Sequence, residues 1–105
     1  MKLQITDAAV KWFEDEMNVS ADQSAAIRFY GKLYGRTKVH HGFSIALARE
    51  LNPHNFGVKV VKDGVTFYIE KDDLWFFAGY DLEVDYDPEK DPENVQYKWT
   101  ENDEL

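Results

Sequence analysis

The sequence contains no cysteine, and this absence excludes several kinds of chemistry. Without thiols the chain has no disulfide, no cysteine nucleophile and no thiolate ligand for a metal. It also lacks a run of about 18 apolar residues, the length that a membrane-spanning helix requires. Its first residues, MKLQITDAAVKW, are too polar for the apolar part of a signal peptide. We therefore expect a cytoplasmic protein that does not bind membranes.

Motifs of common enzymes and nucleotide-binding proteins are missing as well. The chain has no G-x-G-x-x-G, G-x-x-x-x-G-K-[ST], G-x-S-x-G or H-E-x-x-H. The acidic stretch DYDPEKDPE (85–93) lacks the central glycine of an EF-hand loop and contains two prolines. We interpret it as a solvated segment, with weak binding of a divalent cation as the alternative. No set of nucleophile, base and orienting acid is indicated, so we expect no enzymatic activity.

Charge is distributed unevenly along the chain. The formal net charge is −8, and residues 81–105 alone sum to this value because ten acids there face only Lys90 and Lys98. Between Asp22 and Glu50 there is no acid, but there are five basic residues and two histidines. An acidic protein repels phosphates, so we expect no nucleic acid as partner. An acidic protein, a small anion or the chain's own acidic tail fits the basic stretch better.

The composition predicts one folded domain. The length of 105 residues is close to the usual domain size, and 44% of the residues are hydrophobic and 15% aromatic. No internal repeat or linker is visible. We expect a single domain over residues 1–105, with an acidic, frayed tail from about residue 100.

A helix is predicted close to the N-terminus. Thr6 has the side chain of an N-cap, Asp7 suits the positive end of the helix dipole, and Asn18 is a typical stop. Between them the apolar residues recur with helical spacing and form one stripe, which is the side that we expect to cover a core. This stripe consists of Ala9, Trp12, Phe13 and Met17.

Alternation of apolar and polar residues predicts five to seven short strands. Asp63-Gly64 lies between two runs rich in β-branched residues and predicts a tight hairpin turn. Asp72 or Asp73 is expected to cap a short helical turn over 74–77, and NPHNFG (52–57) is expected to be a turn. The prediction is an α+β domain that is mainly β. The strand patterns are AIRFYGKLY (26–34), GFSIALA (42–48), VKVVKDGVTFYIE (58–70), DLEVDYD (81–87) and NVQYKW (94–99).

The stretch KVHHGFSIAL (38–47) is the candidate site. If His40 and His41 lie on a strand, their side chains point to opposite faces, whereas in a turn both can reach one ligand. A transition metal usually needs three or four protein ligands, and the only further histidine is His54. Arg36 and Lys38 beside them favour contact with an anion. We expect these four residues, Arg36, Lys38, His40 and His41, to contact a ligand or a partner if the stretch has more than a structural role.

Three segments together resemble the HesB-like family of A-type iron–sulfur carriers. They are ITDAAVKWF, IRFYGKLYGRTKVHHGFSIAL and KDGVTFYIEKDDLWFFAGYDLEVDY, which follow the order and spacing of that family over roughly residues 3–87. The GFS at 42–44, Asp63-Gly64 and residues 79–86 match its motifs best. The resemblance implies one N-terminal helix packed on short, mostly antiparallel strands that form a curved sheet or a flattened barrel or sandwich. It also implies a homodimer as one possible assembly.

The resemblance implies iron–sulfur cluster assembly, but the cluster ligands of the family are missing. In the family, three cysteines hold the cluster or the iron. In the family the first of these cysteines precedes S-G-F, and His40 occupies that position here. The other two cysteines form a C-G-C motif, which the acidic NVQYKWTENDEL (94–105) replaces. Clusters are held by thiolates with imidazole as an occasional substitute, so we expect no cluster as cofactor. His40 is the one residue of this set that we expect to be able to bind a metal.

Two functions follow from these observations. The first is that of a non-enzymatic accessory protein, which meets an iron–sulfur assembly or target protein through a surface that it shares with the family and that includes the basic loop 35–41. The second is that of a domain that binds a small anion or a hard metal through residues 36–41. Reconstitution with iron and sulfide, and metal titration of a His40→Ala variant, separate them.

Overall fold

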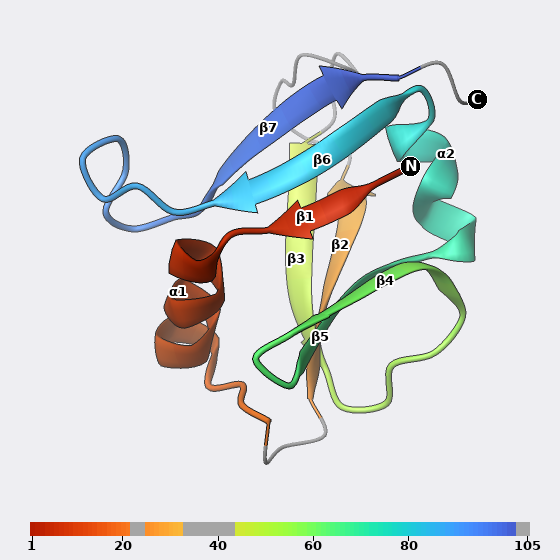
Figure 1. The fold of residues 1–105 in the computed structure, drawn as a ribbon. Helices are drawn as coiled ribbons and strands as arrows, with labels where there is room; N and C mark the ends of the chain where they lie inside the picture. The colour runs from red at the N-terminus through yellow and green to blue at the C-terminus, as the bar shows by residue number, and fades with distance from the viewer. Residues whose placement is uncertain (22–24, 33–43, 103–105) are drawn as a thin grey trace.

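The computed structural model describes residues 1–21, 25–32 and 44–102, and Figure 1 shows their arrangement. These ranges contain two helices, one 3₁₀ turn and seven strands. The helices and the turn are α1 (Asp7–Met17), α2 (Leu74–Phe77) and η1 (Lys71–Asp73). The strands are β1 (Leu3–Ile5), β2 (Ala26–Lys32), β3 (Ser44–Glu50), β4 (Phe56–Lys62), β5 (Val65–Glu70), β6 (Tyr80–Asp85) and β7 (Gln96–Glu101).

The strands form two mixed sheets. The larger sheet has the order β3-β2-β5-β4, and the smaller has the order β1-β6-β7. Within them, β2 runs parallel to β5 and β1 runs parallel to β6, whereas the other neighbours are antiparallel. In Figure 1 the three-stranded sheet crosses the upper half of the molecule, with α1 below one end and α2 beside the other. Within the described ranges, the two sheets do not close into a barrel.

One aromatic and aliphatic core lies under helix α1 and between the sheets. Phe13 of the helix packs against Phe29 of β2 and Phe67 of β5, with ring centroids 6.0 and 5.3 Å apart. The three-stranded sheet adds Leu82 and Val84, which are buried. Burying aromatic rings of this size contributes most of the hydrophobic stabilisation that a domain of this length needs.

Helix α1 has the ends that the sequence predicts. The backbone N–H of Ala9 donates to Oγ1 of Thr6 at 3.2 Å, which is the N-cap bond. Asn18 terminates the helix in the left-handed conformation, with φ 53°. Of the predicted apolar stripe, Ala9 and Phe13 are fully buried, while Trp12 packs edge-on against Phe13.

The hairpin at Asp63-Gly64 is confirmed. Both residues have positive φ, 53° and 76°, as a two-residue turn with the twist of the flanking strands requires. The predicted turn over 52–57 ends earlier than expected, because Phe56 and Gly57 already belong to β4. A register shift occurs there, and a side chain at Gly57 would collide with Leu74.

Three further features differ from the sequence-based prediction. Strand β1 was not predicted, since three residues are too few to show alternation. The short helix α2 is present, but neither Asp72 nor Asp73 caps it with a side chain; their carboxylates contact Asn55 and Arg28 instead. Strand β7 extends to Glu101, past the expected start of a frayed tail, and Asn102 donates its N–H to the carbonyl oxygen of Gly79. Residues 103–105 lie outside the described part.

Candidate functional site

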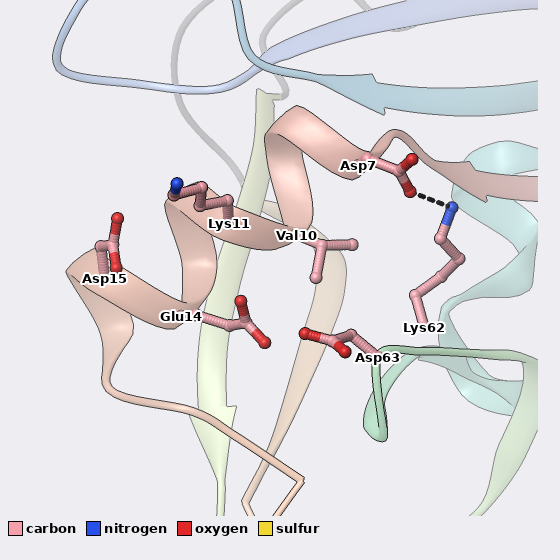
Figure 2. Close-up of a pocket in the computed structure, with 7 residues that line it drawn as sticks. All are labelled: Asp7, Val10, Lys11, Glu14, Asp15, Lys62 and Asp63. Atoms are coloured by element: carbon pink, nitrogen blue, oxygen red, sulfur yellow. Dashed lines mark ion pairs between the residues drawn. The ribbon is translucent and has the colours of Figure 1, made fainter.

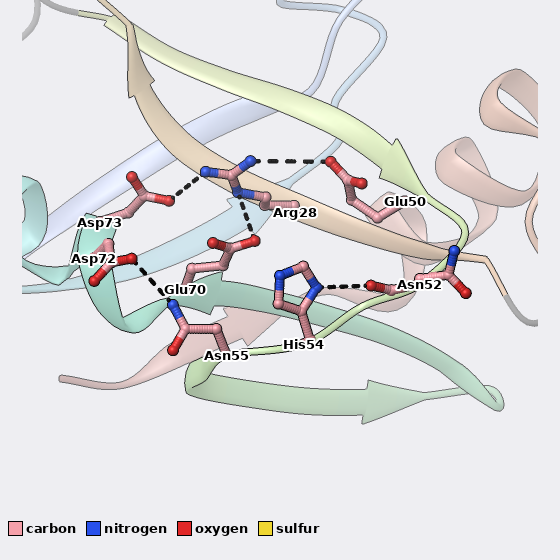
Figure 3. A network of polar contacts seen from close by, with 8 residues as sticks. All are labelled: Arg28, Glu50, Asn52, His54, Asn55, Glu70, Asp72 and Asp73. Atoms are coloured by element: carbon pink, nitrogen blue, oxygen red, sulfur yellow. Dashed lines mark hydrogen bonds and ion pairs between the residues drawn. The ribbon is translucent and has the colours of Figure 1, made fainter.

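The four residues of the predicted ligand site lie outside the described residues. Arg36, Lys38, His40 and His41 belong to the segment between β2 and β3, and their roles remain predictions. His54 is described, and its exposed ring lies with Nδ1 2.9 Å from the carbonyl oxygen of Asn52 (Figure 3). Over residues 1–21, 25–32 and 44–102, no group of three or more His, Asp or Glu side chains could hold a metal ion. The described residues therefore give no support to a hard-metal or anion site.

Arg28 is the centre of the main polar network (Figure 3). Its guanidinium donates from Nη2 to Asp73 at 2.7 Å and lies 3.5 Å from Glu70 and 3.9 Å from Glu50. It also lies 4.7 Å above the ring of Tyr30. The contacts join β2, β3, β5 and η1. Burial opposes the charge, but the bond to Asp73 and the neighbouring acids outweigh it and raise the pKa of Arg28.

One guanidinium faces three carboxylates here, so the network carries an excess of negative charge. The side chain of Arg28 is only 25% exposed, which makes these charges less screened than charges in bulk water. Tyr68 lies opposite Arg28 in the parallel register of β2 and β5. Its buried hydroxyl has no hydrogen-bond partner. Burial, followed by the acids Glu50 and Glu70, raises the pKa of Tyr68.

A second polar region lies between helix α1 and the hairpin of β4 and β5 (Figure 2). It is an open pocket of about 590 Å³ that is lined by acids, lysines and Val10. Lys62 pairs with Asp7 at 2.9 Å. The carboxyl groups of Glu14 and Asp63 face each other, and their hydrogen bond, together with repulsion from Asp63, raises the pKa of Glu14. The contact between the two carboxyl groups accounts for this shift, and a carboxylate pair on an exposed surface is by itself no evidence of a catalytic site.

The third region is apolar and lies around helix α2. Trp75 is 57% exposed although it stands in the aromatic run LWFF, whose Phe76 and Phe77 are fully buried. A hollow of about 350 Å³ lies beside it. The other residues that line this hollow are Met1, Leu74, Phe77, Ala78, Gly79 and Asn102.

Comparison with solved structures identifies the class of fold. Escherichia coli SufA, described as involved in the biosynthesis of iron–sulfur clusters, aligns with a TM-score of 0.59 and 16% identity, over 99% of this chain and 83% of SufA. IscA with a [2Fe-2S] cluster aligns with a TM-score of 0.54 and 12% identity, over 94% of this chain and 84% of IscA. The chain therefore has the HesB-like fold of the A-type carriers, without their cysteines. The predicted fold resemblance is confirmed.

Comparison with known sequences identifies the family more closely. A Bacillus subtilis (strain 168) protein named pyruvate dehydrogenase inhibitor is 35% identical over 99 residues, which cover 93% of this chain and 100% of that protein. The chain belongs to the family of this protein. An uncharacterized protein of Staphylococcus haemolyticus is 29% identical over 93 residues, covering 85% of this chain and 93% of the relative. No profile of a protein family matches the sequence.

The side chains of this chain do not fit an iron–sulfur cluster. Clusters in proteins are held by thiolates, with histidine as an occasional replacement, and the sequence has no cysteine and three histidines. Nδ1 of His54 lies 2.9 Å from the carbonyl oxygen of Asn52, and among the described residues His54 belongs to no group of three or more side chains that could hold a metal ion. The fold of the carriers is thus present without the donor atoms that their cargo requires.

Sequence reasoning missed the Arg28 network and the exposed Trp75. Arg28 was one of several polar residues on an alternating strand, and its partners lie far away in the sequence. Only the parallel pairing of β2 and β5 brings Glu70 and Asp73 to it. For Trp75 a signal exists, because three consecutive aromatic residues on a short helix cannot all face one core.

No helix among the described residues is long and apolar enough to cross a membrane.

Proposed function

We propose that this chain is a non-enzymatic, protein-binding inhibitor of pyruvate dehydrogenase. The observation that carries this proposal is the 35% identity to the Bacillus subtilis pyruvate dehydrogenase inhibitor, which extends over the full length of that relative. An identity of this size over a whole domain favours retention of a binding surface as well as of the fold. The partner is then an enzyme, and the chain inhibits it by binding to it.

The chemistry of the described side chains supports a binding role. The main charged cluster holds structural elements together, because Arg28 contacts Glu50, Glu70 and Asp73. The hydrogen bond to Asp63 accounts for the raised pKa of Glu14, and burial accounts for that of Tyr68, so structural contacts explain both shifts. An exposed tryptophan beside an apolar hollow is instead typical of a surface that binds another protein.

Cluster transfer is not part of the proposal. The accessory role in iron–sulfur assembly is suggested by the fold alone, and the donor set does not fit a cluster. We also propose that the chain acts in the cytoplasm, because a domain without cysteines forms no disulfide and needs no oxidising compartment to fold.

The decisive experiment measures the activity of pyruvate dehydrogenase with and without the purified chain. The complex from Bacillus subtilis is assayed by NADH formation from pyruvate, and a lactate dehydrogenase assayed with the same readout is the control. We expect saturable inhibition of pyruvate dehydrogenase and no effect on the control enzyme. Full activity at a large molar excess of the chain would contradict the proposal. Size-exclusion chromatography of the chain alone tests the predicted homodimer.

Anaerobic reconstitution with iron and sulfide tests the other half of the proposal. We expect no stoichiometric cluster and no visible absorption, because no thiolate is available. A stable cluster at one per chain or per dimer would show that carrier chemistry persists with other ligands, and it would restore cluster assembly as the function.

A further inference from the structure

Helix α2 exposes one large aromatic side chain at a defined place. Trp75 stands edge-on to Phe76, with ring centroids 5.8 Å apart, and Phe76 in turn is buried against Phe77. The indole ring therefore packs against buried aromatic side chains, even though 57% of the residue is exposed. Such a side chain enters an interface without losing much conformational freedom, which is one reason why tryptophan often dominates binding energies.

The hollow beside Trp75 offers room for a side chain of another molecule. Its volume of about 350 Å³ lies at the lower end of the range for binding pockets. Leu74, Phe77 and Ala78 give it an apolar lining, and Asn102 supplies a polar group on one side. Asn102 is held in place, because its side-chain amide donates to Asp81 at 2.7 Å. The hollow is thus lined by side chains of α2 and by Asn102, whose position a hydrogen bond fixes.

Acidic side chains flank this hollow from two directions. Asp73, the last residue before α2, is two positions from Trp75, so their Cα atoms lie within about 7 Å. It belongs to the network in which Arg28 balances only one of three carboxylates. Asp81 lies behind Asn102, and the hydrogen bonds from the Lys2 N–H and from Asn102 lower its pKa and keep it ionised.

The balance of charge around α2 remains negative when the bases are counted. The acids of the network and of the adjoining segments outnumber the bases there. These acids are Glu50, Glu70, Asp72, Asp73, Asp81 and Glu101, and the bases are the Met1 amino group, Lys2, Arg28 and Lys71. An apolar hollow within an acidic surround is complementary to an apolar side chain that has lysine or arginine next to it.

We propose that Trp75 and the hollow beside it are the docking point for a basic segment of the protein partner. An apolar side chain of this segment fills the hollow against the indole ring, and an adjacent lysine or arginine is held by the carboxylates next to α2. This inference rests on the proposed function and names the surface through which the chain binds pyruvate dehydrogenase.

The test compares two exposed apolar residues of similar exposure. Trp75→Ser removes the proposed anchor, and Val61→Ser on β4, where Val61 is 56% exposed, is the matched control. Binding to pyruvate dehydrogenase is measured by surface plasmon resonance at low and high salt. We expect Trp75→Ser to raise the Kd about tenfold or more and Val61→Ser to leave it within about twofold. We also expect high salt to weaken binding of the wild type, because the contact is partly electrostatic.

The outcomes separate this inference from the proposed function. If the wild type binds and inhibits the enzyme but Trp75→Ser binds equally well, the docking surface is wrong and the function stands. An equal loss in Trp75→Ser and Val61→Ser would also overturn the surface. Because both side chains are largely exposed, both variants are expected to fold, and their melting temperatures confirm this before binding is measured.

If the wild type does not bind pyruvate dehydrogenase, the proposed function fails and the surface is tested with defined peptides. One peptide alternates lysine and leucine, and its counterpart replaces every lysine by glutamate. Calorimetric titration should then show binding of the basic peptide alone, and weaker binding to Trp75→Ser than to Val61→Ser. Equal binding of the basic peptide to both variants, or no binding to the wild type, would overturn the docking surface.

Discussion

The four-stranded and the three-stranded sheet share one core but hold their carboxylates in different ways. On the four-stranded sheet, Glu50 and Glu70 converge with Asp73 on a single cation, Arg28. On the three-stranded sheet, Asp81 and Asp85 each have donors of their own. Asp81 accepts from the Lys2 N–H and from the Asn102 amide, both at 2.7 Å, and Asp85 accepts from the Thr6 hydroxyl at 2.6 Å.

This difference shows how the same sign of charge can be used for two purposes. A shared cation links several elements, so its loss leaves all its carboxylates without a counter-charge at once. Separate donors act locally, and loss of one affects a single bond that water can replace on an exposed surface. Charge on the four-stranded sheet therefore stabilises tertiary structure, whereas charge on the three-stranded sheet mainly fixes the ends of the strands.

The inner faces of the two sheets differ as well, and core substitutions give the largest expected effect. Phe67→Ala on β5 should lower the free energy of unfolding by about 3–5 kcal/mol, because a ring packed against Phe13 leaves a cavity. Val84→Ala on β6 removes less apolar surface and should cost about 1.5 kcal/mol. Urea denaturation of both variants measures the difference. If both variants lose the same free energy of unfolding, the aromatic part of the core does not stabilise the fold more than the aliphatic part.

Removal of the shared cation should have the next largest effect. Arg28→Ala is expected to lower the free energy of unfolding by about 1–3 kcal/mol, since a side chain that is mostly buried loses its bond to Asp73 and leaves the acids unpaired. The double variant with Asp73→Asn should recover part of this loss. If the second substitution adds a further loss instead, the three carboxylates do not act as one unit.

The carboxylates of the three-stranded sheet should give the smallest effect, which is visible only as a change in pH dependence. The hydrogen bond from Thr6 lowers the pKa of Asp85 in the folded state. Its stabilisation is therefore present above the unfolded pKa of about 3.9 and is lost as the pH falls through the lower, folded pKa. Asp85→Asn should flatten the fall in melting temperature below about pH 4.

A control for this pH effect is Thr6→Ser, which keeps the hydroxyl that caps α1 and donates to Asp85. Its melting temperature should depend on pH as that of the wild type does. If Thr6→Ser flattens the curve as Asp85→Asn does, the hydroxyl bond is not the cause of the lowered pKa.

Local signals in the sequence were sufficient for helix α1 and for the central hairpin. The cap at Thr6, the stop at Asn18 and the turn at Asp63-Gly64 each depend on residues within a few positions. The alternation of 81–87 likewise predicted a strand, and its apolar residues Leu82 and Val84 are buried. Such features follow from backbone and side-chain preferences that need no partner from elsewhere in the chain.

Features that depend on pairing between distant residues could not be predicted. Strand β1 has only three residues and exists because β6 pairs with it. Asp73 has the sequence signal of a helix cap, but Arg28, 45 positions away, provides a charged partner and takes its carboxylate. The docking surface at Trp75 could not be predicted for the same reason, because the acids around α2 come from four different parts of the chain.

The parallel pair of β1 and β6 also has a consequence for the synthesis of the protein. Thr6 and Asp85 are 79 positions apart, and Leu3 pairs with Leu82. At about 5–20 residues per second, a ribosome needs about 4–16 s to add the intervening chain. During that time strand β1 has no β6 to pair with, whereas helix α1 can already pack on β2 and β5 through Phe13. A nascent chain of this protein must therefore keep the backbone of β1 unpaired until nearly the whole sequence has been translated, which makes this strand a natural contact for a chaperone at the ribosome exit.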